Sequence, residues 1–255
     1  MASPTNPDRP AWMEGPPARC EALPKLQHSA KRLVLLGAPG VGKGTQAALL
    51  HHRLGACHLS TGDVFRSAGS RPESAQTPAI REALAYIRRG ELVPDATVLE
   101  MVRERKVCLH CRGGFILDGF PRTVGQAESL RKLMQDEGLS LNAVINYDLP
   151  AHEIVQRLGG RRTCSQCKAV YNVSERPPKV ADRCDVCHGS LFQREDDRPE
   201  AIRVRLDTYQ RSTAPLIDFY RELGFLVQVS AIGSPEEIYT RTLSLLPLST
   251  GRPSA

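Results

Sequence analysis

A glycine-rich segment at residues 37–45, GAPGVGKGT, has the composition of a loop that binds phosphate. An apolar run at residues 33–36 precedes it and leucines at helical spacing follow it, so the segment joins a strand to a helix. In that context the backbone N–H groups converge on phosphate oxygens, and the start of the helix adds partial positive charge. Lys43 supplies a mobile cation for the β and γ phosphates of a nucleoside triphosphate, so we expect it to be catalytic. The less favoured alternative is a plain strand-to-helix turn, and Gly44, which separates Lys43 from Thr45, departs from the common form of the motif.

Two further groups of polar residues follow predicted strands. Asp118 and Arg122 come after the apolar run at residues 115–117, where Asp118 can organise the water ligands of Mg²⁺ and Arg122 can reach a phosphate. Thr61 and Arg66 follow a shorter run near residues 57–59 and point to the same cleft. Taken alone, the sequence STGD at residues 60–63 is more often a simple helix cap.

Four cysteines form two pairs with the spacing Cys-x-x-Cys, and the pairs are separated by 16 residues. Two such chelating pairs complete a tetrahedral thiolate site for Zn²⁺, and four thiolates leave no coordination position open for a substrate. We therefore predict a structural zinc site formed by Cys164, Cys167, Cys184 and Cys187. Two disulfides or an iron site are the alternatives. Cys108 and Cys111 share the spacing but lack a second pair, so we expect them to be ordinary thiols.

The elements that must position these residues alternate between strand and helix. Apolar runs at residues 33–36, 115–117, 143–145 and 225–227, with a fifth near 57–59, predict a parallel five-stranded sheet flanked by helices, an α/β fold whose ligands bind beyond the carboxyl ends of the strands. Two stretches, 60–93 and 157–195, do not follow this alternation of strands and helices, and we predict that they are insertions over the site. Both belong to one core spanning residues 31–248, and residues 1–30 and 249–255 are predicted to be disordered.

Composition and charge restrict the class of protein further. The chain has 255 residues, with 41% hydrophobic and 24% charged residues, and contains no apolar run near the ~20 residues of a membrane helix. The net charge of +6 is compatible with nucleic-acid binding, but small phosphate ligands explain many of the arginines equally well. We expect a cytoplasmic monomer without nucleic-acid or membrane partners.

The motifs and their order resemble those of adenylate kinases of the long-lid type found widely in bacteria, over about residues 31–246. The resemblance implies a P-loop nucleoside triphosphatase fold and reversible transfer of the terminal phosphoryl group from Mg-ATP to AMP, giving two ADP. It further implies that residues 60–93 are the monophosphate-binding region and residues 157–195 the lid.

The same resemblance assigns residues to each substrate. It implies that ATP is held by Gly40, Val41, Gly42, Lys43, Gly44, Thr45 and Arg157. It implies that AMP is held by Thr61, Arg66, Gly90, Leu92, Val93, Gly119, Arg122, Gln126, Arg194 and Arg205. The residues implied to act on the transferring group are Lys43, Arg122, Arg161, Arg194 and Arg205. A cluster of arginines suits phosphoryl transfer, because that chemistry depends on positioning and charge stabilisation.

Two alternative functions remain open at this point. Residues 69–78, GSRPESAQTP, are longer and poorer in glycine than the corresponding turn of the family, which leaves room for a kinase with another monophosphate or GTP preference. The second alternative belongs to a different class of protein, a zinc-ribbon nucleic-acid-binding ATPase. That class predicts aromatic or lysine-rich faces on the ribbon, and only Tyr171 and Phe192 flank this one.

Overall fold

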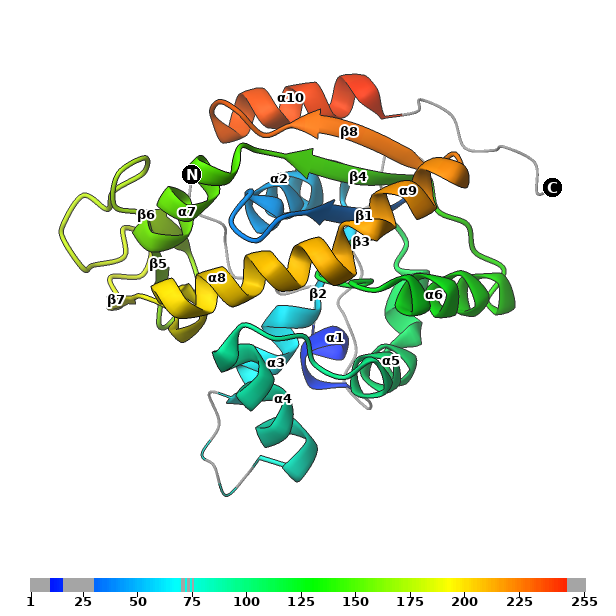
Figure 1. The fold of residues 1–255 in the computed structure, drawn as a ribbon, viewed down its shortest axis with the longest axis horizontal. Coiled ribbons are helices and arrows are strands. Elements are labelled where there is room, and N and C mark those ends of the chain that lie inside the picture. The colour runs from blue at the N-terminus through cyan, green and yellow to red at the C-terminus, as the bar shows by residue number, and fades with distance from the viewer. Residues whose placement is uncertain (1–9, 16–29, 70–71, 73, 75, 247–255) are drawn as a thin grey trace.

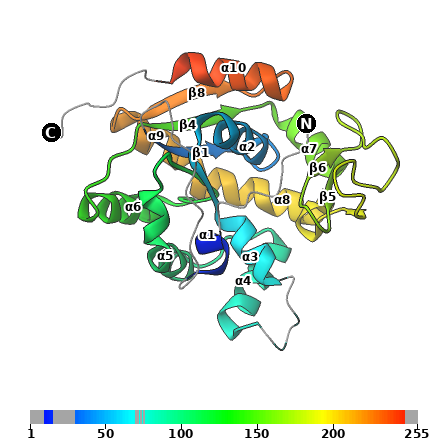
Figure 2. The same ribbon diagram turned by 180° about the vertical axis from the view of Figure 1, so that it is seen from behind.

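The structure is a computed structural model that describes residues 10–15, 30–69, 72, 74 and 76–246. Its centre is a parallel sheet with the strand order β2-β3-β1-β4-β8. The predicted fold class is therefore confirmed. The strands are β1 (Lys31–Gly37), β2 (Cys57–Ser60), β3 (Gly114–Asp118), β4 (Ala143–Asp148) and β8 (Leu226–Ser230). Figures 1 and 2 show helices covering both faces of this sheet.

The sheet is apolar on both faces because successive side chains of a strand point to opposite sides. Along β1, Val34 and Leu36 pack into one hydrophobic cluster and Leu33 and Leu35 into the other. Burial of each such leucine removes it from water and stabilises the fold by roughly 1.5–3 kcal/mol.

Different helices cover the two faces. The first face is covered by α5 (Asp95–Glu104), α6 (Val124–Asp136) and α9 (Pro215–Glu222). The second is covered by α2 (Lys43–Leu54), α7 (Ala151–Gly160) and α10 (Pro235–Leu245). None of the helices among the described residues combines the length and apolar character needed to cross a bilayer.

The two predicted insertions project from this core next to each other (Figures 1 and 2). The first contains α3 (Thr61–Gly69) and α4 (Pro78–Arg89). The second contains a small antiparallel sheet in the order β6-β5-β7, made of β5 (Arg161–Cys164), β6 (Val170–Asn172) and β7 (Leu191–Phe192).

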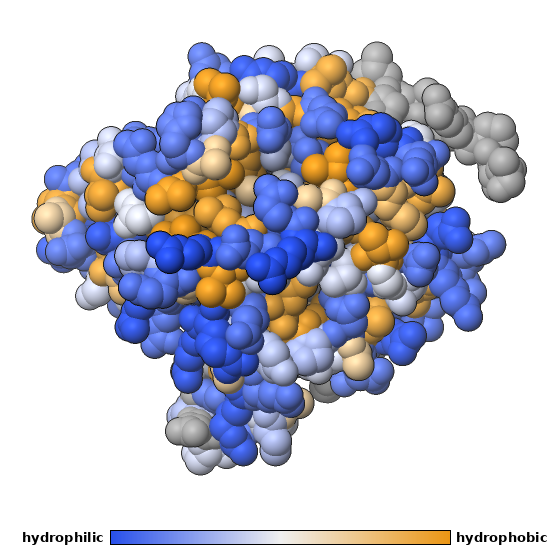
Figure 3. All heavy atoms as spheres, in the orientation of Figure 1, coloured by the Kyte–Doolittle hydropathy of each residue, from blue (hydrophilic) through white to orange (hydrophobic). Residues whose placement is uncertain are grey.

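The chain returns from the second insertion through the 3-10 helix η3 (Glu195–Asp197) and then α8 (Pro199–Thr208). Helix α8 lies between the two insertions and continues through a π turn, η4 (Tyr209–Thr213), into α9. A short 3-10 helix, η2 (Lys106–His110), joins α5 to β3 and contains Cys108. On the face shown in Figure 3, hydrophilic side chains gather along α8 and over the α3–α4 projection, with hydrophobic residues between them.

The N-terminal segment differs from its prediction. Residues Pro10–Glu14 form helix α1, and Trp12 is fully buried in the hydrophobic cluster under α3 and α5. The prediction that residues 1–30 form a disordered tail is therefore wrong for residues 10–15. A five-residue helix has no detectable hydrophobic period, so only the tertiary contact of its tryptophan identifies it. The predicted disordered end, residues 249–255, lies outside the described residues.

Candidate active site

The glycine-rich segment lies between β1 and α2, as predicted. Backbone conformation explains its glycines: Gly42 has φ 102°, and a Cβ atom on Gly37 would lie 2.4 Å from the carbonyl oxygen of Tyr147. The ammonium group of Lys43 donates to the carbonyl oxygens of Gly37 at 2.7 Å and Ala38 at 3.0 Å. The lysine therefore lies over the loop, where an incoming phosphate can exchange for these two carbonyls.

Several arginines from distant parts of the chain approach Lys43. The pKa of Lys43 is lowered to about 7, by burial first and then by the charges of Arg122, Arg205 and Arg161, while the charge of Asp118 acts in the opposite direction. Arg122 precedes α6, Arg161 begins β5 and Arg205 lies on α8, so three separate elements bring positive charge to one point. Such a concentration of positive charge favours the binding of anions.

Two carboxylates at the base of the second insertion hold two of these arginines, Arg161 and Arg205, in place. Arg161 binds fully buried Asp197 with two hydrogen bonds, one of them from Nε to Oδ2 at 2.7 Å. Arg205 lies between Asp196 at 3.1 Å and Asp197 at 3.0 Å. Burial lowers the pKa of Arg205 to about 10 against the opposing effect of these carboxylates. The bidentate geometry fixes the plane of the Arg161 guanidinium group, whereas Arg205 contacts both carboxylates through Nη1 alone.

Arg194 completes the cluster from the strand connection before η3. Its Nε donates to Oγ1 of Thr163 at 2.9 Å. Burial, and then the charges of Arg66 and Arg161, lower the pKa of Arg194 to about 9. The first and second insertions thus both contribute cations to the same cleft.

The opposite side of the cleft is formed where β2 and β3 end. Thr61 donates through Oγ1 to the carbonyl oxygen of Gly119 at 3.0 Å, and Nε of Arg122 donates to the same oxygen at 2.9 Å. Arg66 is paired with Asp63 at 2.7 Å. The backbone N–H of Arg122 donates to Oε1 of buried Gln126 at 2.8 Å. The structure therefore brings Thr61, Gly119, Arg122 and Gln126 together.

The end of α4 closes the same side against α8. Gly90 has φ 80°, and a Cβ atom there would lie 2.6 Å from the carbonyl oxygen of Ala201, so only glycine allows this approach. Leu92 and Val93 follow directly, and Val93 is buried in the core cluster.

Arg157 occupies a different environment from the other predicted arginines. Its Nε donates to Glu175 at 3.0 Å and its Nη1 to the carbonyl oxygen of Ala231 at 3.4 Å. These partners belong to the second insertion and to the end of β8, rather than to the carboxylates that hold Arg161 and Arg205.

Asp118 has a partner, His58, that the sequence motifs did not predict. Nε2 of His58 lies 3.3 Å from Oδ2 of Asp118, and both side chains are largely buried. Burial raises the pKa of Asp118, but the hydrogen bond and charge of His58 and the charge of Lys43 outweigh it, so the net pKa is lowered. The signal for this contact in the sequence is that His58 is a titratable residue inside the second strand. It lies two positions before Ser60, and Ser60 pairs with Asp118 across the sheet.

The four predicted cysteines converge in the second insertion. Their sulfur atoms lie within 4.8 Å of one another, with Cys164–Cys187 at 3.4 Å and Cys167–Cys184 at 3.5 Å. These separations are longer than the ~2.05 Å of a disulfide bond and suit four thiolates around one ion.

The two cysteine pairs also have matching backbone geometry. Cys164 and Cys184 each donate a backbone N–H to the carbonyl five residues later, at 2.9 Å in both cases. Lys168 and His188, which follow the second cysteine of each pair, adopt φ 61° and φ 60°. The donor set and its repeated turns fit a zinc ion.

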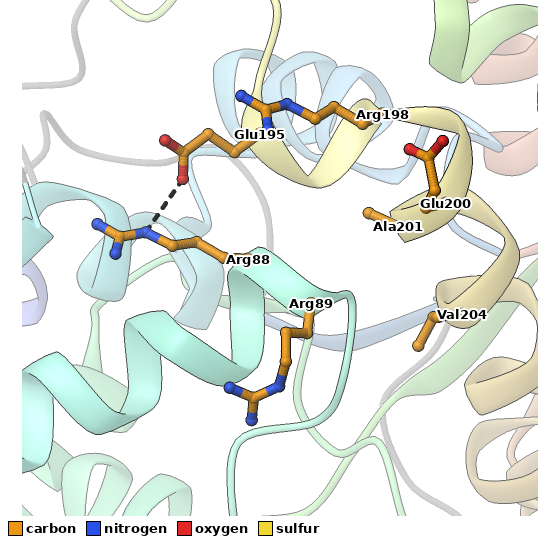
Figure 4. A pocket seen from close by; sticks show the side chains of 7 residues that line it. All are labelled: Arg88, Arg89, Glu195, Arg198, Glu200, Ala201 and Val204. Carbon is orange, nitrogen blue, oxygen red and sulfur yellow. Dashed lines mark ion pairs between the residues drawn. The ribbon is translucent and has the colours of Figure 1, made fainter.

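A cavity of about 670 Å³ lies outside the cationic cluster, between the end of α4 and the segment formed by η3 and the start of α8. Figure 4 shows Arg88 of α4 reaching across it to Glu195 of η3, at 3.0 Å, while Arg89 points away. Both side chains of this ion pair are more than half exposed, so it contributes little to stability.

Comparisons with known proteins agree with this arrangement. A family model described as adenylate kinase matches residues 35–225. A protein named adenylate kinase from Thermodesulfovibrio yellowstonii is 50% identical over 215 residues, which cover 84% of this chain and 98% of that protein. Proteins of the same name from Carboxydothermus hydrogenoformans and Streptomyces griseus are 47% and 43% identical; they cover 82% and 86% of this chain and are themselves covered to 95% and 98%.

Proposed function

The chain belongs to the adenylate kinase family, and from this premise we propose how its residues divide the work of the reaction. The enzyme transfers the terminal phosphoryl group of ATP to AMP, reversibly, and gives two ADP. Kinases that prefer another base and nucleic-acid-binding ATPases are not favoured by these similarities.

On the donor side, the backbone of residues 40–45 binds the ATP phosphates and Lys43 moves from the carbonyls of Gly37 and Ala38 to the β and γ phosphates. The helix start and the left-handed glycines support this role, since they direct N–H groups outward from the loop. Arg157 contacts ATP from the lid side, after exchanging its bond to Glu175 for the nucleotide.

On the acceptor side, Arg66 and Arg122 bind the phosphate of AMP and Gln126 binds its base. Thr61 and Gly119 shape the pocket, and Gly90, Leu92 and Val93 lie against the adenine. The support is that the backbone N–H of Arg122 holds the amide of Gln126, while Nε of Arg122 is held by the carbonyl oxygen of Gly119, so both side chains are anchored to one turn.

The transferring phosphoryl group is stabilised by Lys43, Arg122, Arg161, Arg194 and Arg205. Its transition state spreads negative charge over the equatorial oxygens, and preorganised cations need no rearrangement as that charge develops. The observation that carries this proposal is the approach of three arginines from separate elements to buried Lys43, whose pKa is lowered by burial first and then by their charges. Closure of both insertions over the cleft excludes water from the reaction.

Two metal ions complete the proposal. Asp118 holds Mg²⁺ through its water ligands, and the ion neutralises phosphate charge when bound with ATP. The carboxylate fits this role, because its lowered pKa keeps it ionised and Oδ2 lies beside Gly44 of the phosphate loop. Cys164, Cys167, Cys184 and Cys187 hold a structural Zn²⁺ that stabilises the lid. We further propose a cytoplasmic location, since four thiols of this kind persist under reducing conditions, and a monomeric state.

Product analysis tests the proposal. The protein is mixed with Mg²⁺, ATP and each nucleoside monophosphate in turn, and we expect ADP to form from AMP. Lys43→Ala and Arg122→Ala should each lower kcat by about 10²–10³ or more without loss of the folded circular-dichroism spectrum. Arg131→Ala, on the exposed face of α6, is the matched control and should keep full activity. Near-normal turnover in either site variant would refute the assigned role.

A further inference from the structure

Gln126 is held in one orientation by two groups of opposite hydrogen-bonding character. Its Nε2 donates to Oδ1 of Asp95 at 2.6 Å, and its Oε1 accepts from the backbone N–H of Arg122 at 2.8 Å. A carboxylate only accepts hydrogen bonds and a backbone N–H only donates them. The amide of Gln126 therefore satisfies both neighbours in one orientation alone.

The flipped orientation is strongly disfavoured because Gln126 is only 2% exposed. Flipping would place Oε1 against the carboxylate of Asp95 and Nε2 against the N–H of Arg122, which leaves buried polar groups without partners. Water cannot replace the lost bonds at such a position.

Asp95 is itself fixed from a second side. Its other oxygen, Oδ2, accepts from Oγ1 of Thr123 at 2.7 Å, and that hydroxyl accepts from the backbone N–H of Gln126 at 3.1 Å. Thr123 is the N-cap of α6, so the carboxylate is tied to the start of the helix that carries Gln126. The carboxylate at the start of α5 thus has both oxygens engaged.

We infer that Asp95 is a specificity-determining positioning residue that makes the acceptor site select 6-aminopurine over 6-oxopurine monophosphates. This inference rests on the proposed role of Gln126 in binding the base. The fixed amide offers one remaining N–H donor and one remaining carbonyl lone pair. Adenine presents N1 as an acceptor and N6–H as a donor, whereas hypoxanthine and guanine present the reverse pattern. Only the flipped amide matches a 6-oxopurine, and Asp95 opposes that flip.

The test compares kcat/KM for AMP and for IMP, with Mg-ATP as donor, in the full-length chain. In Asp95→Asn the neutral amide can donate as well as accept, so one of the two restraints on Gln126 is removed. We expect the ratio of kcat/KM for AMP to kcat/KM for IMP to fall by about tenfold or more, because a charge-assisted hydrogen bond is lost. KM for AMP should rise while KM for ATP stays within about twofold of the wild-type value. Asp136→Asn, an exposed carboxylate at the end of α6, is the control and should keep the wild-type ratio.

The double variant separates a positioning role from a general structural one. Gln126→Ala alone should lose base discrimination, and adding Asp95→Asn to it should change the ratio no further, because the residue through which Asp95 acts is gone. An unchanged ratio in Asp95→Asn, with discrimination lost in Gln126→Ala, overturns the inference and leaves the proposed function standing. An unchanged ratio in Gln126→Ala overturns the role of Gln126 and the inference together. If Asp95→Asn does not fold, Thr123→Val must lower the same ratio, and its failure to do so also overturns the inference.

Discussion

Trp12 donates its indole N–H to the backbone carbonyl oxygen of Ser60 at 3.0 Å, so the N-terminal helix is bonded to the last residue of β2. Its own carbonyl oxygen accepts from Nε of Arg105 at 2.8 Å, after the end of α5. Trp12 therefore joins α5 to the point where the first insertion leaves the sheet. The family model matches residues 35–225. Trp12 therefore belongs to a segment that lies outside the matched residues and packs against them.

Replacing this side chain should destabilise the protein strongly. We expect Trp12→Ala to lower the free energy of unfolding by about 3–5 kcal/mol, through lost burial and an unpaired carbonyl at Ser60. Urea denaturation followed by circular dichroism measures the change. Glu14→Ala, an exposed residue of the same helix, should stay within ~0.5 kcal/mol of wild type.

Fluorescence gives a second measure of the same contact. Trp12 is the sole tryptophan of the chain, so its emission reports on this helix alone. A buried indole should emit at shorter wavelength in the native protein than in urea. Emission that is solvent-like under native conditions would show that α1 does not dock.

The sequence predicted the parts of this enzyme that local pattern determines. The phosphate loop, the four cysteines and the five strands each have a signature within a few residues, because glycine, thiolate and apolar runs have few other uses in those orders. Trp12, His58 and Asp95 could not be found this way. Each acts through a partner distant in the chain, at Ser60, Asp118 and Gln126, and only the folded sheet brings these pairs together.

Zinc removal should loosen the lid before the core. The lid cluster consists of Cys164, Cys184 and three neighbours, too few apolar residues to fold without the metal. We expect the wild-type protein to contain stoichiometric zinc and Cys164→Ser to lose it. Hydrogen exchange should then become faster in β5 to β7 and remain slow in β1 and β3.

Cys111→Ser is the control for this experiment, since it removes a half-buried thiol outside the cluster. It should retain wild-type zinc content and lid protection. Wild-type protein purified without chelators and free of stoichiometric metal would contradict the zinc assignment.

Asp197 should be the most sensitive carboxylate at the base of the lid. It is fully buried and bound by Arg161 and Arg205, so Asp197→Ala removes the carboxylate that binds Arg161 and leaves Arg205 with Asp196 alone. Removing one member of a buried ion pair typically costs about 3–5 kcal/mol, and we expect a loss of that size in thermal or urea unfolding. Asp207→Ala, exposed on α8, is the control and should be near neutral. A loss below ~1 kcal/mol in Asp197→Ala would show that the arginines find other partners.

Lys43 should couple nucleotide binding to proton uptake. Burial and the neighbouring arginines lower its pKa to about 7, so above that pH the lysine of the free enzyme is largely neutral. The unfolded chain, with an ordinary lysine pKa, then binds more protons than the folded chain, and the free energy of unfolding rises with pH from about 7 to 10.5 through this group. ATP phosphates favour the charged form, so binding at pH 8 should take up about 0.9 proton, and KM for ATP should rise with pH above 7. Calorimetric titration with ATP in two buffers of different ionisation heat measures the uptake.

Lys43→Met should abolish this proton uptake, and the control Lys132→Met, exposed on α6, should keep it. Equal proton uptake in wild type and Lys43→Met would assign the proton to another group and remove the evidence that Lys43 charges upon binding.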